Sequence, residues 1–156
     1  MSTVTVTRCK ATIPGEIRWY PEAASQSFKK GQFVYLSAVG KLTACASNAT
    51  GCCGIAEGDA SGTTDTAIPV TIAKRGQQYT VFVTNGGSGT TTAVSQVGKQ
   101  YDIYVASNVC YLNTAGTSQR FFTVDALASE DTVGDTNGRL VVEVRGIYAQ
   151  LDSGTS

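Results

Sequence analysis

The sequence predicts an all-β protein, a small β-barrel or β-sandwich, and three observations favour this fold class. Short segments rich in Val, Tyr, Phe, Ile and Thr recur along the chain, often alternating with polar residues. Turn residues such as Asn85-Gly86-Gly87 separate them, and glycine supplies 17 of the 156 residues. Helix signals are scarce: short helices are expected only at residues 22–26 and 126–130, and neither segment has a sustained helical period. Short strands at regular spacing are typical of barrels and sandwiches.

The first expected strand has two interpretations. Ser2 to Cys9 alternate Thr with Val and precede a Pro14-Gly15 turn. Residues 1–20 are therefore either the first strand of the barrel or an extended N-terminal arm that adds to the sheet edge of a partner protein. Residues 21–156 are expected to form the β-barrel domain. In chain order, the expected strands cover residues 3–7, 33–37, 68–73, 79–83, 101–106, 121–126 and 140–146.

An internal repeat indicates two β-rich halves of similar plan, residues 28–76 and 95–146. Gly31 begins the stretch GQFVYLS and Gly98 begins GKQYDIYVA, and both halves end in an alternating strand with a basic residue before Gly. Chance similarity between two glycine-rich β segments is the alternative. Whether the halves form one barrel or two lobes stays open.

The adjacent pair Cys52-Cys53 is interpreted as strand residues. The repeat sets these two residues in register with Phe121 and Phe122, so that one thiol faces in and the other faces out. A free cysteine behaves as a small hydrophobic residue, and neighbouring thiols on opposite faces do not converge on one metal ion. We therefore expect no metal site and no redox pair. The chain has five cysteines, an odd number that favours free thiols: Cys9, Cys45, Cys52, Cys53 and Cys110.

Charge and histidine content exclude several classes of function. Lys and Arg number 12 and Asp and Glu number 12, so that no basic field exists to bind nucleic acid. No apolar run reaches the roughly 20 residues that a membrane helix needs. The N-terminus lacks the apolar core of a signal peptide, which indicates synthesis in a cytoplasm. Without histidine, nucleophile systems that need an imidazole base and zinc sites with histidine ligands are excluded. We expect no catalytic residues and no cofactor.

Trp19-Tyr20-Pro21 is the aromatic group that lies outside a clean strand pattern. Its rings either cap the open end of the barrel or anchor a protein interface, where Trp and Tyr are enriched. Together with the N-terminal arm, this group supplies the candidate protein-interface residues, which are Thr3, Val4, Thr5, Val6, Arg8, Trp19 and Tyr20.

A family resemblance is carried by the stretch FKKGQFVYLSAVGKLTACASNATGCCGIAEG, which starts at Phe28. It contains the motif G-x-x-V-Y at residues 31–35, G-x-L-T at 40–43 and G-I-A-x-G at 54–58. With these motifs the chain resembles the capsid decoration, or cement, proteins of tailed bacteriophages. The likeness covers about residues 28–76, whereas Cys52-Cys53 and the loop at residues 85–92 depart from the group's pattern.

The resemblance implies a structural virion protein, not an enzyme. Such a protein binds the outer surface of a phage capsid and stabilises it by bridging subunits of the major capsid protein, often as a trimeric homo-oligomer. It is made in the host cytoplasm and resides on the capsid exterior. No nucleic acid, membrane, metal or cofactor is expected to take part.

Two other functions remain as alternatives. The first is a carbohydrate- or cell-surface-binding module, such as the head of a fibre or adhesin, in which Trp19 and Tyr20 act with the loop at residues 135–138. The second is a hydrolase that uses carboxylates alone, against the simpler interpretation of a solvated acidic loop. Its candidate residues are Asp125, Glu130, Asp131 and Asp135.

Overall fold

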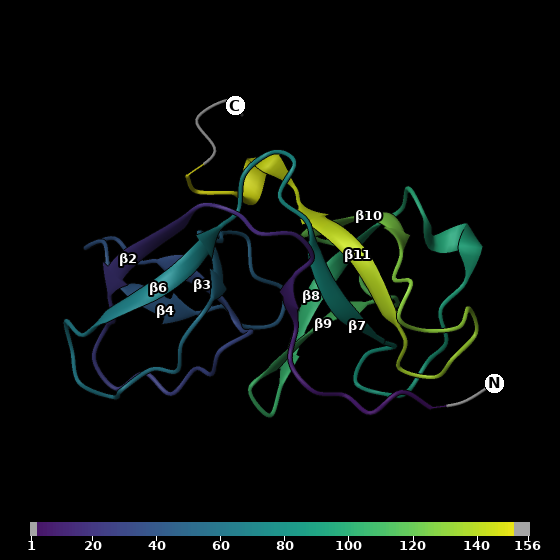
Figure 1. The fold of residues 1–156 in the computed structure, drawn as a ribbon, viewed down its shortest axis with the longest axis horizontal. Helices are drawn as coiled ribbons and strands as arrows, with labels where there is room; N and C mark the ends of the chain where they lie inside the picture. The colour runs from purple at the N-terminus through teal and green to yellow at the C-terminus, as the bar shows by residue number, and fades with distance from the viewer. Residues whose placement is uncertain (1–2, 152–156) are drawn as a thin grey trace.

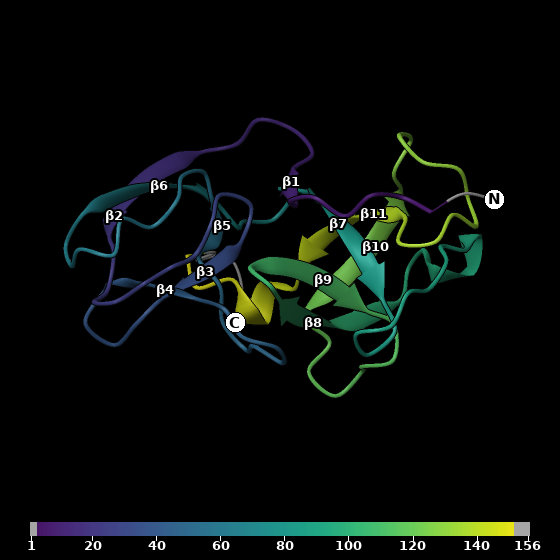
Figure 2. The ribbon, with the colours of Figure 1, turned by 90° about the horizontal axis from the view of Figure 1, so that it is seen from below.

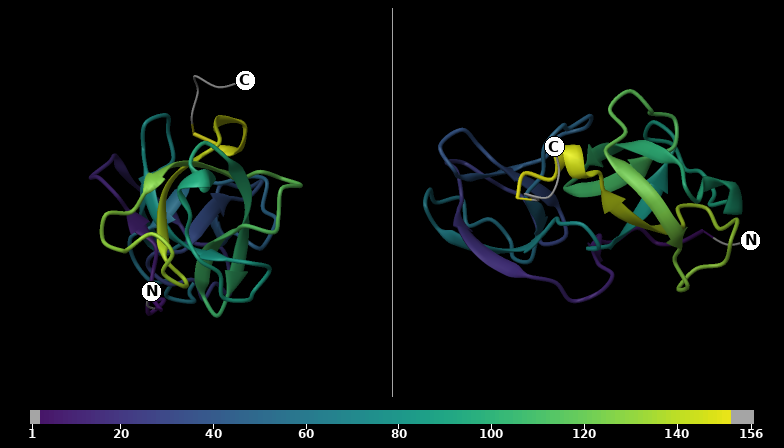
Figure 3. Two further views of the ribbon diagram at one scale, coloured as in Figure 1. Left: turned by 90° about the vertical axis from the view of Figure 1, so that its right-hand side faces the viewer. Right: turned by 90° about the horizontal axis from the view of Figure 1, so that it is seen from above.

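Two β-sheets lie side by side along the long axis of the computed structural model, which describes residues 3–151 (Figure 1, Figure 3). The all-β fold class is confirmed. The first sheet has the strand order β2-β6-β5-β3-β4, with β2 (Ile17–Pro21), β3 (Phe33–Leu36), β4 (Leu42–Ala44), β5 (Gly54–Ala56) and β6 (Ala67–Ile72). The second has the order β1-β7-β11-β10-β8-β9, with β1 (Lys10–Ala11), β7 (Tyr79–Thr84), β8 (Gln100–Ala106), β9 (Val109–Asn113), β10 (Phe122–Leu127) and β11 (Arg139–Val144).

Three expectations about local structure are wrong. Residues 3–7 form an extended segment with one isolated bridge, Thr3 to Thr136, because no neighbouring strand runs alongside them. Residues 22–26 and 126–130 are not helical. The first of these segments leaves β2 through a bridge to β4, and the second contains the end of β10 and an ion-paired turn. Within residues 3–151, two short 3-10 helices lie elsewhere, at Val94–Gln96 and Gly146–Tyr148.

The two sheets have the same topology. When β2 to β6 are matched in order to β7 to β11, each strand of the first sheet has the same neighbours as its counterpart in the second. Equivalent hydrogen bonds fix the register: the N–H of Gly31 donates to the C=O of Ala56, and the N–H of Gly98 donates to the C=O of Val124, both at 2.8 Å. The similarity of the two segments therefore extends to strand order and register.

The register of the cysteine pair differs from the expected one by a single residue. Ala73 N–H donates to the C=O of Cys53, and Arg145 N–H donates to the C=O of Phe121, both at 2.9 Å and at equivalent points of the two sheets. Cys53, and not Cys52, therefore matches Phe121.

The two sheets close to different extents. In the second sheet, β7 pairs in parallel with β9 from Phe82 to Thr84, which completes a five-stranded barrel. In the first sheet, the equivalent contact is the single parallel bridge between Glu22 and Leu42. The first sheet is therefore joined at one point, and most of the free edge of β2 stays open.

One core connects the two lobes. Phe33 of the first sheet makes edge-on ring contacts with Tyr79 and Phe122 of the second, with centroids 5.1 and 5.2 Å apart. Its cluster also contains Cys52 and Ile55, whereas Cys53 belongs to a smaller cluster around Phe28 within the first lobe. The thiols of Cys52 and Cys53 lie on opposite faces, but both are buried, because the outer face at Cys52 packs against the second lobe.

Both ends of the described chain cross between the lobes. Residues 3–11 run along the second barrel, although the next strand in the chain, β2, lies in the first lobe (Figure 2). After β11 the chain returns to the first lobe, where the main chain of Cys52 pairs with Ala149 and the side chain of Gln150 bonds both main-chain groups of Leu36. Within residues 3–151, no helix has the length and apolar character needed to cross a membrane.

Candidate binding surface

The outer face of β2 carries the most conspicuous exposed aromatic side chain. Trp19 is 65% exposed and Ile17, two residues earlier on the same face, is 53% exposed. Successive strand residues alternate between faces, so that Tyr20 points the other way and packs against the core of the first lobe. β2 lies at the outer side of the first lobe, away from the second barrel (Figure 1, Figure 2).

A charged network lies on the opposite face of β2, because Arg18 alternates with Ile17 and Trp19 along the strand. The carboxylate of Glu16 accepts hydrogen bonds from the guanidinium of Arg18 and the ammonium of Lys74. The hydrogen bond from Arg18, followed by that from Lys74, lowers the pKa of Glu16 to about 2. All three side chains are solvent-accessible, so the ion pairs contribute little to stability.

The expected interface residues of the N-terminal segment lie elsewhere, along the second barrel and at its junction with the first lobe. Val4 and Val6 pack against the large core, and Arg8 forms an ion pair with Asp59 at 3.3 Å. Thr3 and Thr5 are exposed. Thr3, Val4 and Val6 therefore lie on the second barrel, whereas Arg8 reaches the loop between β5 and β6 of the first lobe. β2, which carries Trp19 and Tyr20, lies at the outer side of the first lobe (Figure 1).

The combination expected for a sugar site is not brought together either. The loop at residues 135–138 lies at the far end of the second barrel, where Thr136 bridges Thr3 and Thr91. The two ribbon views agree that β2 and this loop are at opposite ends (Figure 1, Figure 2). Trp19 and the loop do not form one surface.

The four candidate carboxylates hold loops in place. Asp131 forms a two-pronged ion pair with the guanidinium of Arg139, which lowers the pKa of Asp131. Glu130 bonds Lys10 at 2.7 Å and also reaches Arg139, and Asp125 accepts a hydrogen bond from Gln78. Asp135 accepts the N–H of Thr132 at 3.0 Å. The contacts of Asp131 and Asp135 stabilise a turn, whereas that of Asp125 links β10 to the residue before β7.

All five thiols are buried in the structure. Burial raises the pKa of Cys9 to about 12, against a weaker lowering by a main-chain hydrogen bond. The same cause raises the pKa of Cys52, Cys53 and Cys110. A nucleophilic cysteine needs a thiolate, so these positions are suited to packing.

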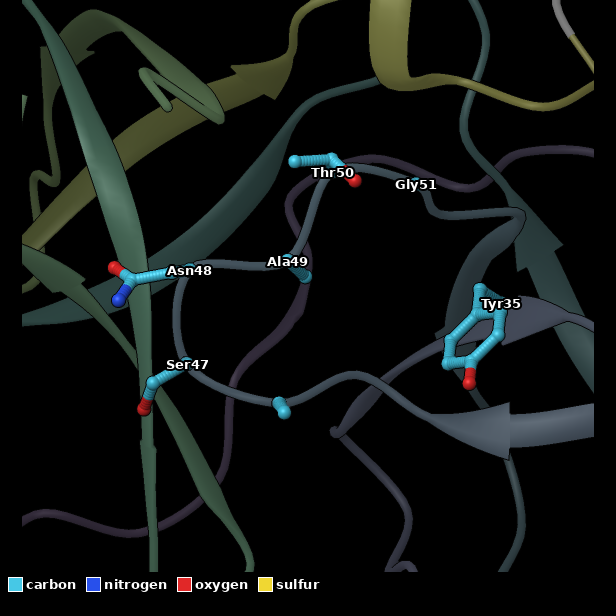
Figure 4. Close-up of a pocket in the computed structure, with 7 residues that line it drawn as sticks. Tyr35, Ser47, Asn48, Ala49, Thr50 and Gly51 are labelled. Atoms are coloured by element: carbon cyan, nitrogen blue, oxygen red, sulfur yellow. The ribbon is translucent and has the colours of Figure 1, made fainter. Parts of the chain in front are cut away.

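A hollow lies where the loop of residues 46–51 leaves the first lobe. It has a volume of about 470 Å³, and Tyr35 of β3 stands across it from the loop (Figure 4). The loop is held to the second barrel, since Asn48 N–H donates to the C=O of Ile103 and Ser47 Oγ bonds both main-chain groups of Val105. None of the seven lining residues carries a charge, and the loop's polar groups serve the contact between the lobes.

Comparisons with known proteins do not identify the chain: no protein-family model matches it, and no curated protein matches it. In residues 3–151, no cluster of three or more cysteine or carboxylate side chains is placed to hold a metal ion. The residue that sequence reasoning missed is Ile17. The alternation in Ile17-Arg18-Trp19-Tyr20 was the available signal, and it places Ile17 beside Trp19.

Proposed function

We propose that this protein is a structural virion protein that decorates the outside of a phage capsid and bridges subunits of the major capsid protein. The observation that carries the proposal is the exposed apolar face of Ile17 and Trp19 on a regular strand. An exposed Trp on a rigid strand is preorganised to bind, because little conformational freedom is lost when it is covered.

The resemblance of residues 28–76 to decoration proteins supports the choice of partner. Repeated sites on a symmetric shell suit a protein whose single contact area is small. If the protein acts as a trimer, three such faces engage the lattice together, and modest individual affinities combine through avidity. The buried thiols and internally bonded carboxylates are consistent with a binding role.

Replacement of Trp19 tests this function. We expect Trp19→Ala to weaken binding at least about thirtyfold, because loss of a central aromatic anchor costs about 2 kcal/mol or more. The measurement is co-sedimentation of the purified protein with shells assembled from the major capsid protein of the same virus. Val94→Ala is the matched control, since Val94 is 67% exposed but lies on the second lobe. Equal binding by Trp19→Ala and the unmodified protein would refute the proposal.

A further inference from the structure

The equivalence of the two sheets allows each position on β2 to be compared with a position on β7. Gly31 bonds Ala56, which lies opposite Val70, and Val70 lies opposite Arg18. In the second sheet, the same path runs from Gly98 through Val124 and Val142 to Tyr79. Arg18 therefore matches Tyr79, and by the same register Trp19 matches Thr80 and Ile17 matches Gln78.

In the second sheet this stretch of strand edge is covered. Lys10 of β1 lies opposite Thr80 in an antiparallel pair, and the N–H of Thr12 donates to the C=O of Gln78 at 2.9 Å. The hydroxyls of Thr12 and Thr80 are also bonded at 2.9 Å. As a result Thr80 is 1% exposed, whereas its counterpart Trp19 is 65% exposed.

The main chain of β2 is open at the corresponding place. The main-chain groups of Glu16 and Glu22 are paired with β6 and with the residue before it. Ile72 N–H donates to the C=O of Glu16 at 2.9 Å, and Glu22 N–H donates to the C=O of Thr66 at 2.8 Å. Alternate residues of an antiparallel strand direct their main-chain groups to opposite edges. The groups of Ile17 and Trp19 therefore point to the edge that, in residues 3–151, carries only the bridge from Glu22 to Leu42.

We propose that the open edge of β2 binds an extended strand of the partner by antiparallel strand addition, in the position that β1 occupies on β7. This inference rests on the proposed function, because it specifies how the face of Ile17 and Trp19 is used. The occupant is an extended segment of the capsid protein, with a side chain over the ring of Trp19 and main-chain groups paired to Ile17 and Trp19. The same mode of binding occurs within the molecule, because β1 is a short extended segment that pairs with the edge of β7.

A pair of substitutions at Ile17 separates strand addition from side-chain contact. Ile17→Pro and Ile17→Ala both remove the side chain, but only proline also removes the N–H that points to the open edge. Proline is tolerated on an edge strand, and the ladder to β6 keeps its donors. We expect Ile17→Pro to bind assembled shells about tenfold more weakly than Ile17→Ala, with unchanged circular dichroism. Equal binding by the two variants would overturn strand addition.

Residue-level hydrogen exchange of the unmodified protein bound to shells gives a second test that does not depend on the folding of a variant. The amides of Ile17 and Trp19 should exchange more slowly in the complex, whereas those of Arg18 and Tyr20, already paired with β6, serve as controls. Binding without this protection overturns strand addition and leaves the proposed function standing. Absence of binding to shells refutes the proposed function and, with it, this inference.

Discussion

Glu22 shows how one buried carboxylate organises the open first sheet. Its oxygens accept the N–H of Ser61 at 2.9 Å, the N–H of Gly62 at 3.1 Å and the hydroxyl of Ser61. Burial by itself would raise the pKa of Glu22, but these hydrogen bonds outweigh it, and the pKa is lowered from 4.5. Glu22 also forms the bridge to Leu42. Its carboxylate therefore ties the loop at residues 61–62 to the residue at which β2 meets β4.

Glu22→Gln is expected to make the protein less stable at neutral pH by about 1–2 kcal/mol, since hydrogen bonds to a charged acceptor are weakened. A group whose pKa is lowered on folding stabilises the fold above its unfolded pKa, and this contribution is lost as the pH falls through the folded pKa. The difference between the two proteins should thus shrink below about pH 4.5. Urea unfolding at a series of pH values measures it.

Glu143→Gln is the control for this prediction, because the carboxylate of Glu143 accepts a single main-chain hydrogen bond, from the N–H of Gly76 at 2.8 Å. At neutral pH, Glu143→Gln should lower the free energy of unfolding by less than Glu22→Gln does. A stability difference between Glu22→Gln and the unmodified protein that is constant from pH 7 to pH 3 would contradict the assigned role of the charge.

At the scale of the elements, the equivalent glycines Gly31 and Gly98 precede β3 and β8 with φ values of 93° and 86°. Both adopt a backbone conformation that costs other residues about 1–2 kcal/mol. Their surroundings differ. A Cβ on Gly31 would lie 2.5 Å from the C=O oxygen of Cys9, whereas a Cβ on Gly98 would meet nothing within 4 Å.

Gly98→Ala is therefore expected to lower the free energy of unfolding by about 1–2 kcal/mol, the cost of the backbone conformation alone. Gly31→Ala should cost at least about 1 kcal/mol more, because the N-terminal segment must also move. Guanidinium unfolding of both variants gives the comparison. If the two substitutions cost the same, the N-terminal segment does not pack on Gly31 as described.

Strand existence was predictable where the sequence pattern was strong. The segments that became β3, β6, β7, β8, β10 and β11 are rich in β-branched and aromatic residues. β4 and β5 have three residues each, and β1 has two, too short for any alternation to be recognised. Val4 and Val6 alternate like a strand, yet they lie along a barrel without a ladder. An alternating pattern of apolar and polar residues indicates which side chains are buried, but it does not indicate that the main chain pairs with a neighbouring strand.

The candidate surface was predictable in part. Trp19 and Tyr20 were recognised as an aromatic pair, but their opposite faces follow from β2, which was not expected as a strand. The open edge could not be predicted at all. It depends on β1 pairing with β7 and leaving the equivalent edge of β2 uncovered, and a pairing between residues 68 positions apart has no local signal.

At the scale of the whole molecule, two lobes with one topology share a continuous core. Phe33 of the first sheet lies against Tyr79, Phe121 and Phe122 of the second. Residues from both sheets belong to the same cluster, and both chain ends cross between the lobes. We therefore expect the lobes to unfold as one cooperative unit, although each sheet looks like a small domain.

A pair of core substitutions tests this cooperativity. Phe28 is buried in the cluster of the first lobe, and Phe33 lies at the junction. Phe28→Leu and Phe33→Leu should each lower the free energy of unfolding by about 1–2 kcal/mol, with the larger loss at Phe33, where three ring contacts are removed. If the lobes unfold together, Phe28→Leu must reduce the protection of the most slowly exchanging amides of β11 as much as that of β6, because both report the global free energy. Native-state hydrogen exchange measures the two strands in one experiment. Loss of protection in β6 alone would show that the second barrel is stable without the first, and that the shared core does not couple them.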